Sequence, residues 1–89
     1  MEISDLELPD GLADHIHPRA TLVEIWEVFS DEPMFLRNRG GVPTSRLMVG
    51  RTLGGRLLTV PITRRGPGLW RARTAYPAKP RERTLYERG

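Results

Sequence analysis

Two apolar stretches of the sequence, Arg46–Thr52 and Arg56–Thr63, flank the dipeptide Gly54-Gly55. A type I′ turn needs positive φ at both of its central positions, and glycine adopts positive φ without a steric penalty. The pattern therefore predicts a β-hairpin with a two-residue loop. This hairpin constrains the chain more than any other feature, because it commits the centre of the sequence to an antiparallel sheet.

A two-residue loop also fixes which side chains share a face of the sheet. It pairs Leu53 with Arg56 and Arg51 with Leu58. Arg51 and Arg56 should then lie diagonally on one face near the turn, about 7 Å apart between backbones. Two guanidinium groups at the rim of an otherwise apolar face suggest a phosphate site.

A helix is predicted upstream of the hairpin. Thr21 and Glu24 have the spacing of a capping box, in which each side chain binds a backbone amide of the first turn. Apolar residues then recur at helical spacing: Leu22, Ile25, Trp26, Val28 and Phe29. The helix should end within residues 30–32, just before Pro33.

The remaining elements are shorter. Leu69–Ala75 is predicted as a third strand, Met34–Arg37 as an edge strand, and Asp5–Leu8 as at most a short strand. Pro80 suits the first turn of a C-terminal helix of roughly residues 80–88. The order predicts an α+β fold, with a three- to four-stranded antiparallel sheet packed by one helix from the N-terminal half and a short C-terminal helix.

The length of 89 residues predicts a single domain, 1–89, in which the acidic segment 1–14 is partly irregular. A hydrophobic content of 38% suffices for one modest core. The absence of cysteine excludes disulfides, thiolate metal sites and thiol nucleophiles. The sequence has neither a secretory signal pattern nor an apolar run near the ~20 residues of a membrane span, so we expect a cytoplasmic protein.

Charge is divided unevenly along the chain. Residues 1–36 hold nine acidic side chains and one basic one, whereas residues 37–89 hold thirteen basic and two acidic ones. Thirteen of the fourteen basic residues are arginine, whose planar guanidinium matches phosphate oxygens in pairs. This composition favours a nucleic-acid partner. The alternative is that arginine is simply the preferred basic residue and that the charges are solvated.

Several positions carry the expected RNA contacts. Strand alternation places Arg71 and Arg73 on the exposed face of the third strand, and puts Tyr76 on the opposite face. The two tryptophans, Trp26 and Trp70, are interpreted as core residues rather than base-stacking ones. The candidate RNA-binding residues are Arg71, Arg73, Tyr76, Lys79, Arg81 and Tyr86.

Four segments of the chain now suggest a family: residues 24–29, 49–58, 74–78 and 82–86. They resemble the BrnT-like toxins of bacterial type II toxin–antitoxin systems, whose pattern is E-x-x-E-V-F, then G-R-T-x-x-G-R-x-L, then [ST]-A-R-x-A-[ST]-x-x-E-R-x-x-Y. The similarity covers roughly residues 20–88 with order and spacing preserved. Two departures are clear, because Tyr76 replaces the arginine after Thr-Ala and the segment from His15 to Ala20 replaces His-Gly-Val.

The resemblance implies a RelE-like fold and metal-independent cleavage of RNA that inhibits translation, with no cofactor or metal ion. It also implies a ribbon-helix-helix antitoxin partner, and thus a hetero-oligomer. It carries function onto four residues of this chain: Arg51, Arg56, Glu82 and Arg83. Tyr86 is implied to be a packing or site residue.

The chemistry assigns roles to these residues. Attack of a 2′-hydroxyl on the neighbouring phosphate needs a general base and cations that stabilise the phosphorane-like state. Arg51, Arg56 and Arg83 suit the cationic role. His15 or His17 suits proton transfer, and we take His17 as the candidate, with Glu82 and Tyr76 as alternatives. Either histidine is also interpretable as a surface residue, and His15-x-His17 lacks further ligands for a metal.

Two other functions remain open from the sequence. The chain is alternatively a catalytically inactive relative that binds RNA or antitoxin, an interpretation that Tyr76 favours. A basic DNA-binding domain ranks last, because no helix-turn-helix spacing appears. The acidic first third is expected either to fold back over the basic sheet or to leave it free for an acidic antitoxin segment.

Overall fold

The chain folds into an α+β structure, as predicted. The computed structural model describes residues 3–38 and 43–89. Within these residues there are six strands and three helices, in the order β1 (Asp5–Glu7), α1 (Leu12–Ile16), α2 (Leu22–Ser30), β2 (Met34–Arg37), β3 (Ser45–Arg51), β4 (Leu57–Gly66), β5 (Leu69–Ala72), β6 (Tyr76–Pro77) and α3 (Pro80–Arg88). None of the helices in this described part is long and apolar enough to cross a membrane.

The sheet is larger than predicted and it is mixed. Its strand order is β1-β5-β4-β3-β2, with β6 pairing with β4 outside that path. The expectation of a purely antiparallel sheet of three to four strands is wrong for two reasons. First, strand β1 pairs with β5 in parallel orientation, with Leu6 opposite Trp70. Second, the ten residues of β4 pair with β5 at one end and with β6 at the other.

Most of the local signals are confirmed. The Thr21 hydroxyl accepts the Glu24 amide, and the Glu24 carboxylate accepts the Thr21 amide, each at 3.1 Å. Helix α2 ends at Ser30, β2 is an edge strand, and α3 begins at Pro80. Helix α1 was not predicted, although its buried residues Leu12 and Ile16 lie one helical turn apart.

The central hairpin forms, but its predicted loop and register are wrong. Only Gly55 has positive φ, at 88°, and the Thr52 amide donates to the Arg56 carbonyl at 2.9 Å. The loop therefore has three residues, 53–55, a length that commonly ends in a left-handed glycine. Arg51 pairs with Leu57 rather than with Leu58. This shift of one residue moves one strand's side chains to the opposite face.

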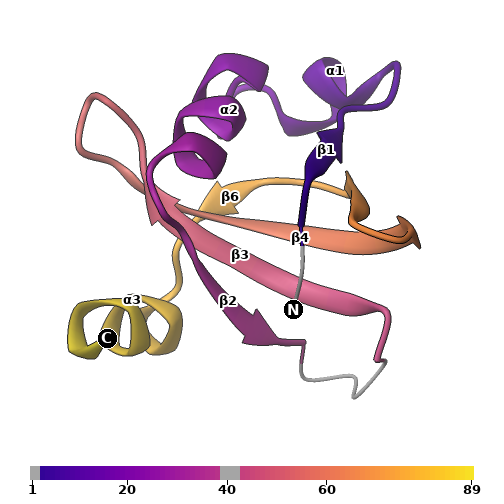
Figure 1. The fold of residues 1–89 in the computed structure, drawn as a ribbon. Helices are drawn as coiled ribbons and strands as arrows, with labels where there is room; N and C mark the ends of the chain where they lie inside the picture. The colour runs from indigo at the N-terminus through magenta and orange to yellow at the C-terminus, as the bar shows by residue number, and fades with distance from the viewer. Residues whose placement is uncertain (1–2, 39–42) are drawn as a thin grey trace.

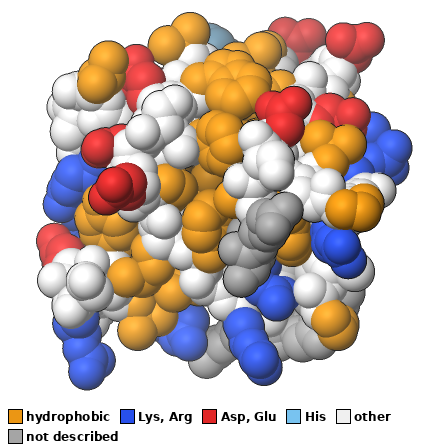
Figure 2. Space-filling model, viewed as in Figure 1, with side chains coloured by type: hydrophobic (Ala, Val, Ile, Leu, Met, Phe, Trp, Pro, Cys, Tyr) orange, Lys and Arg blue, Asp and Glu red, His pale blue; other side chains and the backbone are white. Residues whose placement is uncertain are grey.

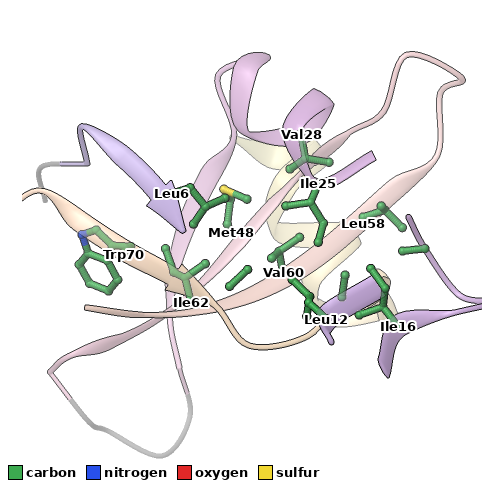
Figure 3. Close-up of a cluster of buried hydrophobic side chains, with 13 residues drawn as sticks. Leu6, Leu12, Ile16, Ile25, Val28, Met48, Leu58, Val60, Ile62 and Trp70 are labelled. Carbon is green, nitrogen blue, oxygen red and sulfur yellow. The ribbon is translucent and has the colours of Figure 1, made fainter. Parts of the chain in front are cut away.

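The two faces of the sheet carry separate cores. Helices α1 and α2 cover one face, and α3 lies across part of the other (Figure 1). The larger core lies under α1 and α2 and contains the residues of Figure 3, among them Ile25, Met48, Val60 and Trp70. The smaller core, under α3, contains Leu47, Val49 and Leu57. Among the described residues, the helices of the acidic first third thus cover one face only, and they leave the rest of the α3 face open.

Two expected side-chain placements also change. Tyr76 was predicted to face away from Arg73, and its pairing with Thr59 places it on the α3 face. The Arg73 side chain reaches the Thr63 hydroxyl of that same face at 3.4 Å, although Arg73 also lines a cavity with Leu12 and His15 of the α1 segment. The strand is interrupted at 73–75, and the simple alternation fails there. Trp70 is buried as expected, whereas Trp26 is 40% exposed and is not a core residue.

Gly50 allows α2 to approach the sheet closely. A Cβ atom at this position would lie 3.1 Å from Val28 Cγ1 and 3.3 Å from Pro33 Cβ. We expect Gly50→Ala to lower the free energy of unfolding by about 1–2 kcal/mol, because the added methyl group overpacks this contact. Urea denaturation measures the loss. Gly54→Ala is the matched control, since its Cβ would meet only Thr52 Oγ1 at 3.8 Å, and an equal loss in both variants would contradict the packing argument.

Candidate functional site

Arg51 and Arg56 lie on opposite faces of the sheet. Because Arg51 pairs with Leu57, its side chain lies on the face of Val49, under α3, and Arg56 lies on the face covered by α2. The prediction that the two guanidinium groups share a face is therefore wrong. Arg51, Arg56 and Arg83 do not converge on a single patch, because the three-residue loop displaces one strand by one position relative to the other.

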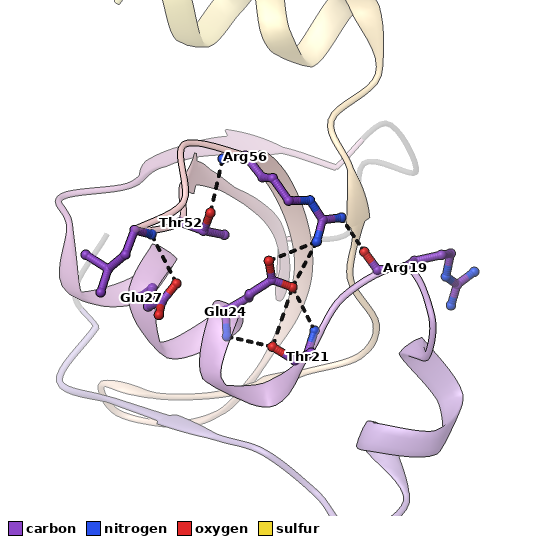
Figure 4. A network of polar contacts seen from close by, with 7 residues as sticks. Arg19, Thr21, Glu24, Glu27, Thr52 and Arg56 are labelled. Atoms are coloured by element: carbon purple, nitrogen blue, oxygen red, sulfur yellow. Dashed lines mark hydrogen bonds and ion pairs between the residues drawn. The ribbon is translucent and has the colours of Figure 1, made fainter.

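Arg56 instead joins α2 to the hairpin (Figure 4). Its Nη1 atom lies 3.0 and 2.8 Å from the two carboxylate oxygens of Glu24, and its Nη2 atom donates to the Arg19 carbonyl. The Arg56 amide donates to the Thr52 hydroxyl at 3.1 Å. Its guanidinium is thus held by protein groups, which gives Arg56 a structural role; the catalytic role stays a prediction.

A second glutamate of α2 holds the same turn. The Leu53 amide donates to Glu27 Oε1 at 3.0 Å. The E-x-x-E segment of α2 and the G-R-T-x-x-G-R segment of the hairpin therefore bind each other through Glu24 and Glu27. Two of the motifs behind the resemblance form one connected structural unit.

Arg51 packs against the last turn of α3. Its Nη1 atom donates to the Gly55 carbonyl at 2.9 Å, and its guanidinium lies 5.9 Å from the centre of the Tyr86 ring. Glu87 Oε2 lies 3.8 Å from Arg51 Nη2. Glu87 therefore approaches Arg51 and makes no ion pair with Arg83 among the described residues. The Arg83 side chain is exposed on α3.

The two histidines lie on the other side of the sheet from α3. His15 and His17 belong to α1 and its C-cap, both are exposed, and α1 packs on the same core as α2. The sheet thus separates His17 from Glu82. In the described part of the chain, no three His, Cys, Asp or Glu side chains gather as a metal ion would require.

Four predicted residues do come together beside the N-terminus of α3. They line a cavity of about 320 Å³, here called the α3 pocket, whose walls are Asn38, Leu47, Pro61, Tyr76, Lys79, Arg81 and Glu82. The sequence did not identify Asn38, Leu47 or Pro61. Leu47 and Pro61 lie opposite each other on β3 and β4. Only a correct hairpin register could have predicted from the sequence that they share a face.

Glu82 forms the polar base of the α3 pocket and is only 6% exposed. Its carboxylate accepts the Thr59 hydroxyl at 2.8 Å, the Lys79 amide at 3.0 Å and the Tyr76 hydroxyl at 3.1 Å. These donors come from β4, β6 and the start of α3. Glu82 therefore ties the helix to the sheet and orients the phenol of Tyr76.

Tyr76 forms the aromatic wall of the α3 pocket. Burial, the nearby charge of Glu82 and the hydrogen bond to that carboxylate together raise the pKa of Tyr76 to about 12. The Lys79 Nζ atom lies 5.1 Å from the centre of the Tyr76 ring, within the range of a cation–π contact. At neutral pH the phenol is protonated, so it donates to Glu82 and offers its oxygen lone pairs to a ligand.

We expect alkaline titration to report this environment. In a Tyr86→Phe background the single remaining tyrosine, Tyr76, should form phenolate with a midpoint near pH 12, followed by ultraviolet absorbance. Glu82→Gln should lower the midpoint toward the ordinary value near 10, because the carboxylate charge is removed. Because the pKa of Tyr76 is higher in the folded protein than in the unfolded chain, the protonated phenol contributes to folding stability below pH 10. This contribution is lost as the pH rises from about 10 to 12. An unchanged midpoint in Glu82→Gln would contradict the assignment.

Two further predicted arginines lie on the same open face. Arg71 pairs with Glu7 across β1 and β5, and Arg65 approaches the same carboxylate at 3.8 Å. Arg73 is exposed and its Nη1 atom lies 3.4 Å from the Thr63 hydroxyl. Arg71 is thus partly neutralised, whereas Arg73 retains an exposed charge on this side of the sheet.

The composition of the α3 pocket suits a nucleotide. Leu47 and Pro61 give an apolar surface, Tyr76 gives a ring on which a base can stack, and Lys79 and Arg81 give exposed cations at the rim. Proteins that bind single-stranded RNA combine aromatic stacking with basic side chains along the backbone. Glu82 and Tyr76 add a hydrogen-bonded pair able to exchange protons.

Comparison with protein-family models and with curated proteins found no match, so the similarity to BrnT-like toxins rests on the sequence motifs alone.

Proposed function

We propose that this protein is the toxin component of a type II toxin–antitoxin pair and that it acts on single-stranded RNA at the α3 pocket, in the cytoplasm and on a RelE-like fold. The observation that carries the proposal is the α3 pocket itself. It combines an apolar surface, an aromatic ring and two exposed cations in one cavity. The motif similarity gives the toxin assignment, and the pocket gives a place for the RNA.

Binding follows from the positions of the pocket side chains. A base stacked on Tyr76 would lie against Leu47 and Pro61, and its flanking phosphate would meet Lys79 and Arg81 at the rim. An unstacked base fits such a cavity, whereas a base inside a duplex cannot reach it. We therefore expect single-stranded RNA to bind more tightly than the same sequence in a duplex.

Cleavage would use the Tyr76–Glu82 pair. The 2′-oxygen attacks the adjacent phosphorus while Tyr76 takes the hydroxyl proton and passes its own proton to Glu82, to which it is hydrogen-bonded at 3.1 Å. Lys79 and Arg81 stabilise the charge of the phosphorane-like state. The bond to the 5′-oxygen breaks, that oxygen takes a proton from Lys79, and a 2′,3′-cyclic phosphate remains.

The test is incubation of the protein with 5′-labelled single-stranded RNA in EDTA. The proposal expects fragments that end in a 2′,3′-cyclic phosphate, and a cleavage rate reduced at least about tenfold in Tyr76→Phe, since positioned acid–base groups contribute 10²–10⁴-fold. Arg64→Ala, an exposed site at the end of β4, is the control and should cleave like the wild type. RNA that is neither bound nor cut would overturn the proposal.

A second candidate function has specific support. Arg51 and Arg56 lie on opposite faces and each is held by protein carboxylate or carbonyl groups. This arrangement favours a binding module without catalytic activity, which would retain RNA or antitoxin. In the same assay such a module would shift the RNA in a gel and leave it intact.

The antitoxin partner has its own test. We propose a ribbon-helix-helix antitoxin encoded beside this chain. Expression of the protein alone in a bacterial host should arrest growth with loss of messenger RNA, and co-expression of the neighbouring reading frame should restore growth. Normal growth together with tight RNA binding would favour the binding module.

A further inference from the structure

A second cavity lies at the opposite end of α3 from the α3 pocket. It has a volume of about 430 Å³ and is lined by Glu32, Met34, Tyr86 and Gly89. Tyr86 and Gly89 belong to the last turn of α3 and its C-cap, whereas Met34 begins β2 and Glu32 lies just before that strand. We call this space the β2 cavity. Its volume is within the range of about 300–1,000 Å³ that is usual for small-ligand sites.

The same helix and the same strand link the two cavities. The α3 pocket is lined by Arg81 in the first turn of α3 and by Asn38, the residue that follows β2. The β2 cavity is lined by the other end of each element. Met34 and Asn38 are four residues apart, which is about 13 Å along an extended strand. A single polymer that occupies the α3 pocket can therefore reach the β2 cavity.

Exposed arginines lie along α3 between the two ends. Arg81 and Arg88 are seven residues apart, so they share one side of the helix at a separation of about 10 Å. Neither forms an ion pair with a described residue. Arg83 is equally exposed, but it is two residues from Arg81 and so lies on the opposite side of α3. Arg81 and Arg88 thus offer two cations to one phosphate backbone.

The distribution of charge over the surface agrees with this path. In the view of Figure 2, Lys and Arg side chains lie along the lower part of the molecule, where Figure 1 shows α3. Most acidic side chains of this view lie above them, around α1 and α2. A polyanion therefore meets a favourable potential near α3 and a less favourable one near the helices of the other face.

The lining of the β2 cavity suits a nucleobase. Tyr86 gives an aromatic ring and Met34 a polarizable thioether, and a Cβ atom at Gly89 would collide with Met34 Cε, so Met34 packs directly against the end of α3. The Glu32 side chain makes no hydrogen bond or ion pair with another described residue. Its φ of 47° is rare for a residue other than glycine, and such backbone strain is found most often at ligand sites.

We propose that the β2 cavity is a second base subsite for the same single-stranded RNA, and that it selects a base with an exocyclic amino group. The inference rests on the proposed function, because the α3 pocket positions the strand. One base stacks in the α3 pocket, the following phosphates meet Arg81 and Arg88, and a base further along the strand enters the β2 cavity. Its amino group donates to the Glu32 carboxylate, which can only accept hydrogen bonds. The preferred ligand is thus an oligonucleotide with adenine, cytosine or guanine at that position.

The first test compares oligonucleotides of different length by fluorescence anisotropy. The 2′-O-methyl forms are used because they lack the hydroxyl nucleophile and stay intact. A hexanucleotide should bind at least about fivefold more tightly than a dinucleotide, since a second stacked base is added. Arg88→Ala should weaken binding of the hexanucleotide and leave that of the dinucleotide unchanged. Arg83→Ala removes the same charge from the other side of α3 and is the matched control, expected to bind both ligands almost as the wild type does.

The second test reads the base at the β2 cavity. Cytosine has an amino group where uracil has a carbonyl oxygen, and the two bases are otherwise of similar size. The wild type should bind a cytidine hexamer more tightly than a uridine hexamer. Glu32→Gln should reduce or reverse this ratio at least about fivefold, because the glutamine amide can donate to the uracil oxygen.

The outcomes separate this inference from the proposed function. Dinucleotide binding that depends on Tyr76, without a gain for the hexanucleotide, would overturn the second subsite and leave the α3 pocket in place. An unchanged cytidine-to-uridine ratio in Glu32→Gln would overturn the selection of the base. Equal losses in Arg88→Ala and Arg83→Ala would show that the strand does not follow one side of α3. Failure of every oligonucleotide to bind would overturn the proposed function and this inference together.

Discussion

Replacing Glu82 with leucine should lower the free energy of unfolding by about 2–4 kcal/mol. The carboxylate is 6% exposed and accepts hydrogen bonds from Thr59, Tyr76 and the Lys79 amide. The Thr59 hydroxyl is fully buried and would lose its acceptor, at a cost of about 1–3 kcal/mol. The first turn of α3 would also lose the group that binds its N-cap amide, which costs about 1 kcal/mol more. Urea denaturation followed by circular dichroism measures the change.

A double-mutant cycle with Thr59→Val separates this hydrogen bond from general damage. Glu82→Leu leaves the Thr59 hydroxyl unpaired, whereas the combined Glu82→Leu and Thr59→Val change removes both polar partners. The loss of unfolding free energy in the double variant should therefore be smaller than the sum of the losses in the two single variants. We expect this difference to be about 1 kcal/mol or more. Additive losses would contradict a coupled role for these two side chains.

The local parts of this fold were predictable because their signals lie within a few residues. The capping box of Thr21 and Glu24 and the proline at the start of α3 define helix ends without help from the rest of the chain. The hairpin depended on a finer choice. A two-residue loop would consist of Gly54 and Gly55 alone, whereas a three-residue loop also includes Leu53. Both loop lengths are compatible with a Gly-Gly sequence. Long-range packing decides between them, because Gly50 must face Val28 on α2.

The candidate site was predictable where it is contiguous in sequence. Tyr76, Lys79, Arg81 and Glu82 belong to one short stretch around the N-terminus of α3, so a motif in that stretch brings all four to the pocket. Arg56 and Glu24 are 32 residues apart, and their ion pair depends on how α2 lies on the sheet. The Arg56 side chain, which the sequence suggested as a phosphate ligand, is therefore bound by Glu24 and by the Arg19 carbonyl. A sequence motif does not reveal such an internal contact.

The parallel pairing of β1 with β5 is long-range in the same sense. Three residues, Asp5–Glu7, carry too little periodicity to specify a neighbour 64 residues away. Their pairing depends on the burial of Leu6 beside Trp70 and on the contact between Glu7 and Arg71. This contact also reduces the charge that Arg71 offers to RNA.

Removing both cations at the pocket rim should weaken the affinity for single-stranded RNA by about 10–100-fold at low salt. Lys79 and Arg81 are exposed, and each would contact a phosphate of a strand whose base occupies the pocket. Each phosphate contact releases counterions and contributes about 0.7 to the slope of log affinity against log salt for single strands. The Lys79→Ala and Arg81→Ala double variant should therefore have a slope smaller by about 1.4, measured by fluorescence anisotropy at several salt concentrations.

The control removes the same charge from the other face of the sheet. Arg37 and Arg64 are exposed, and the register places both on the side covered by α2, away from the pocket. The Arg37→Ala and Arg64→Ala double variant should lose affinity only slightly, through the lower net charge, and should keep the wild-type slope. If both double variants lose affinity equally, RNA responds to the overall charge of the protein and the pocket has no special part in binding. A difference in slope between them would instead locate the phosphate contacts at the rim beside α3, because net charge is matched and only position differs.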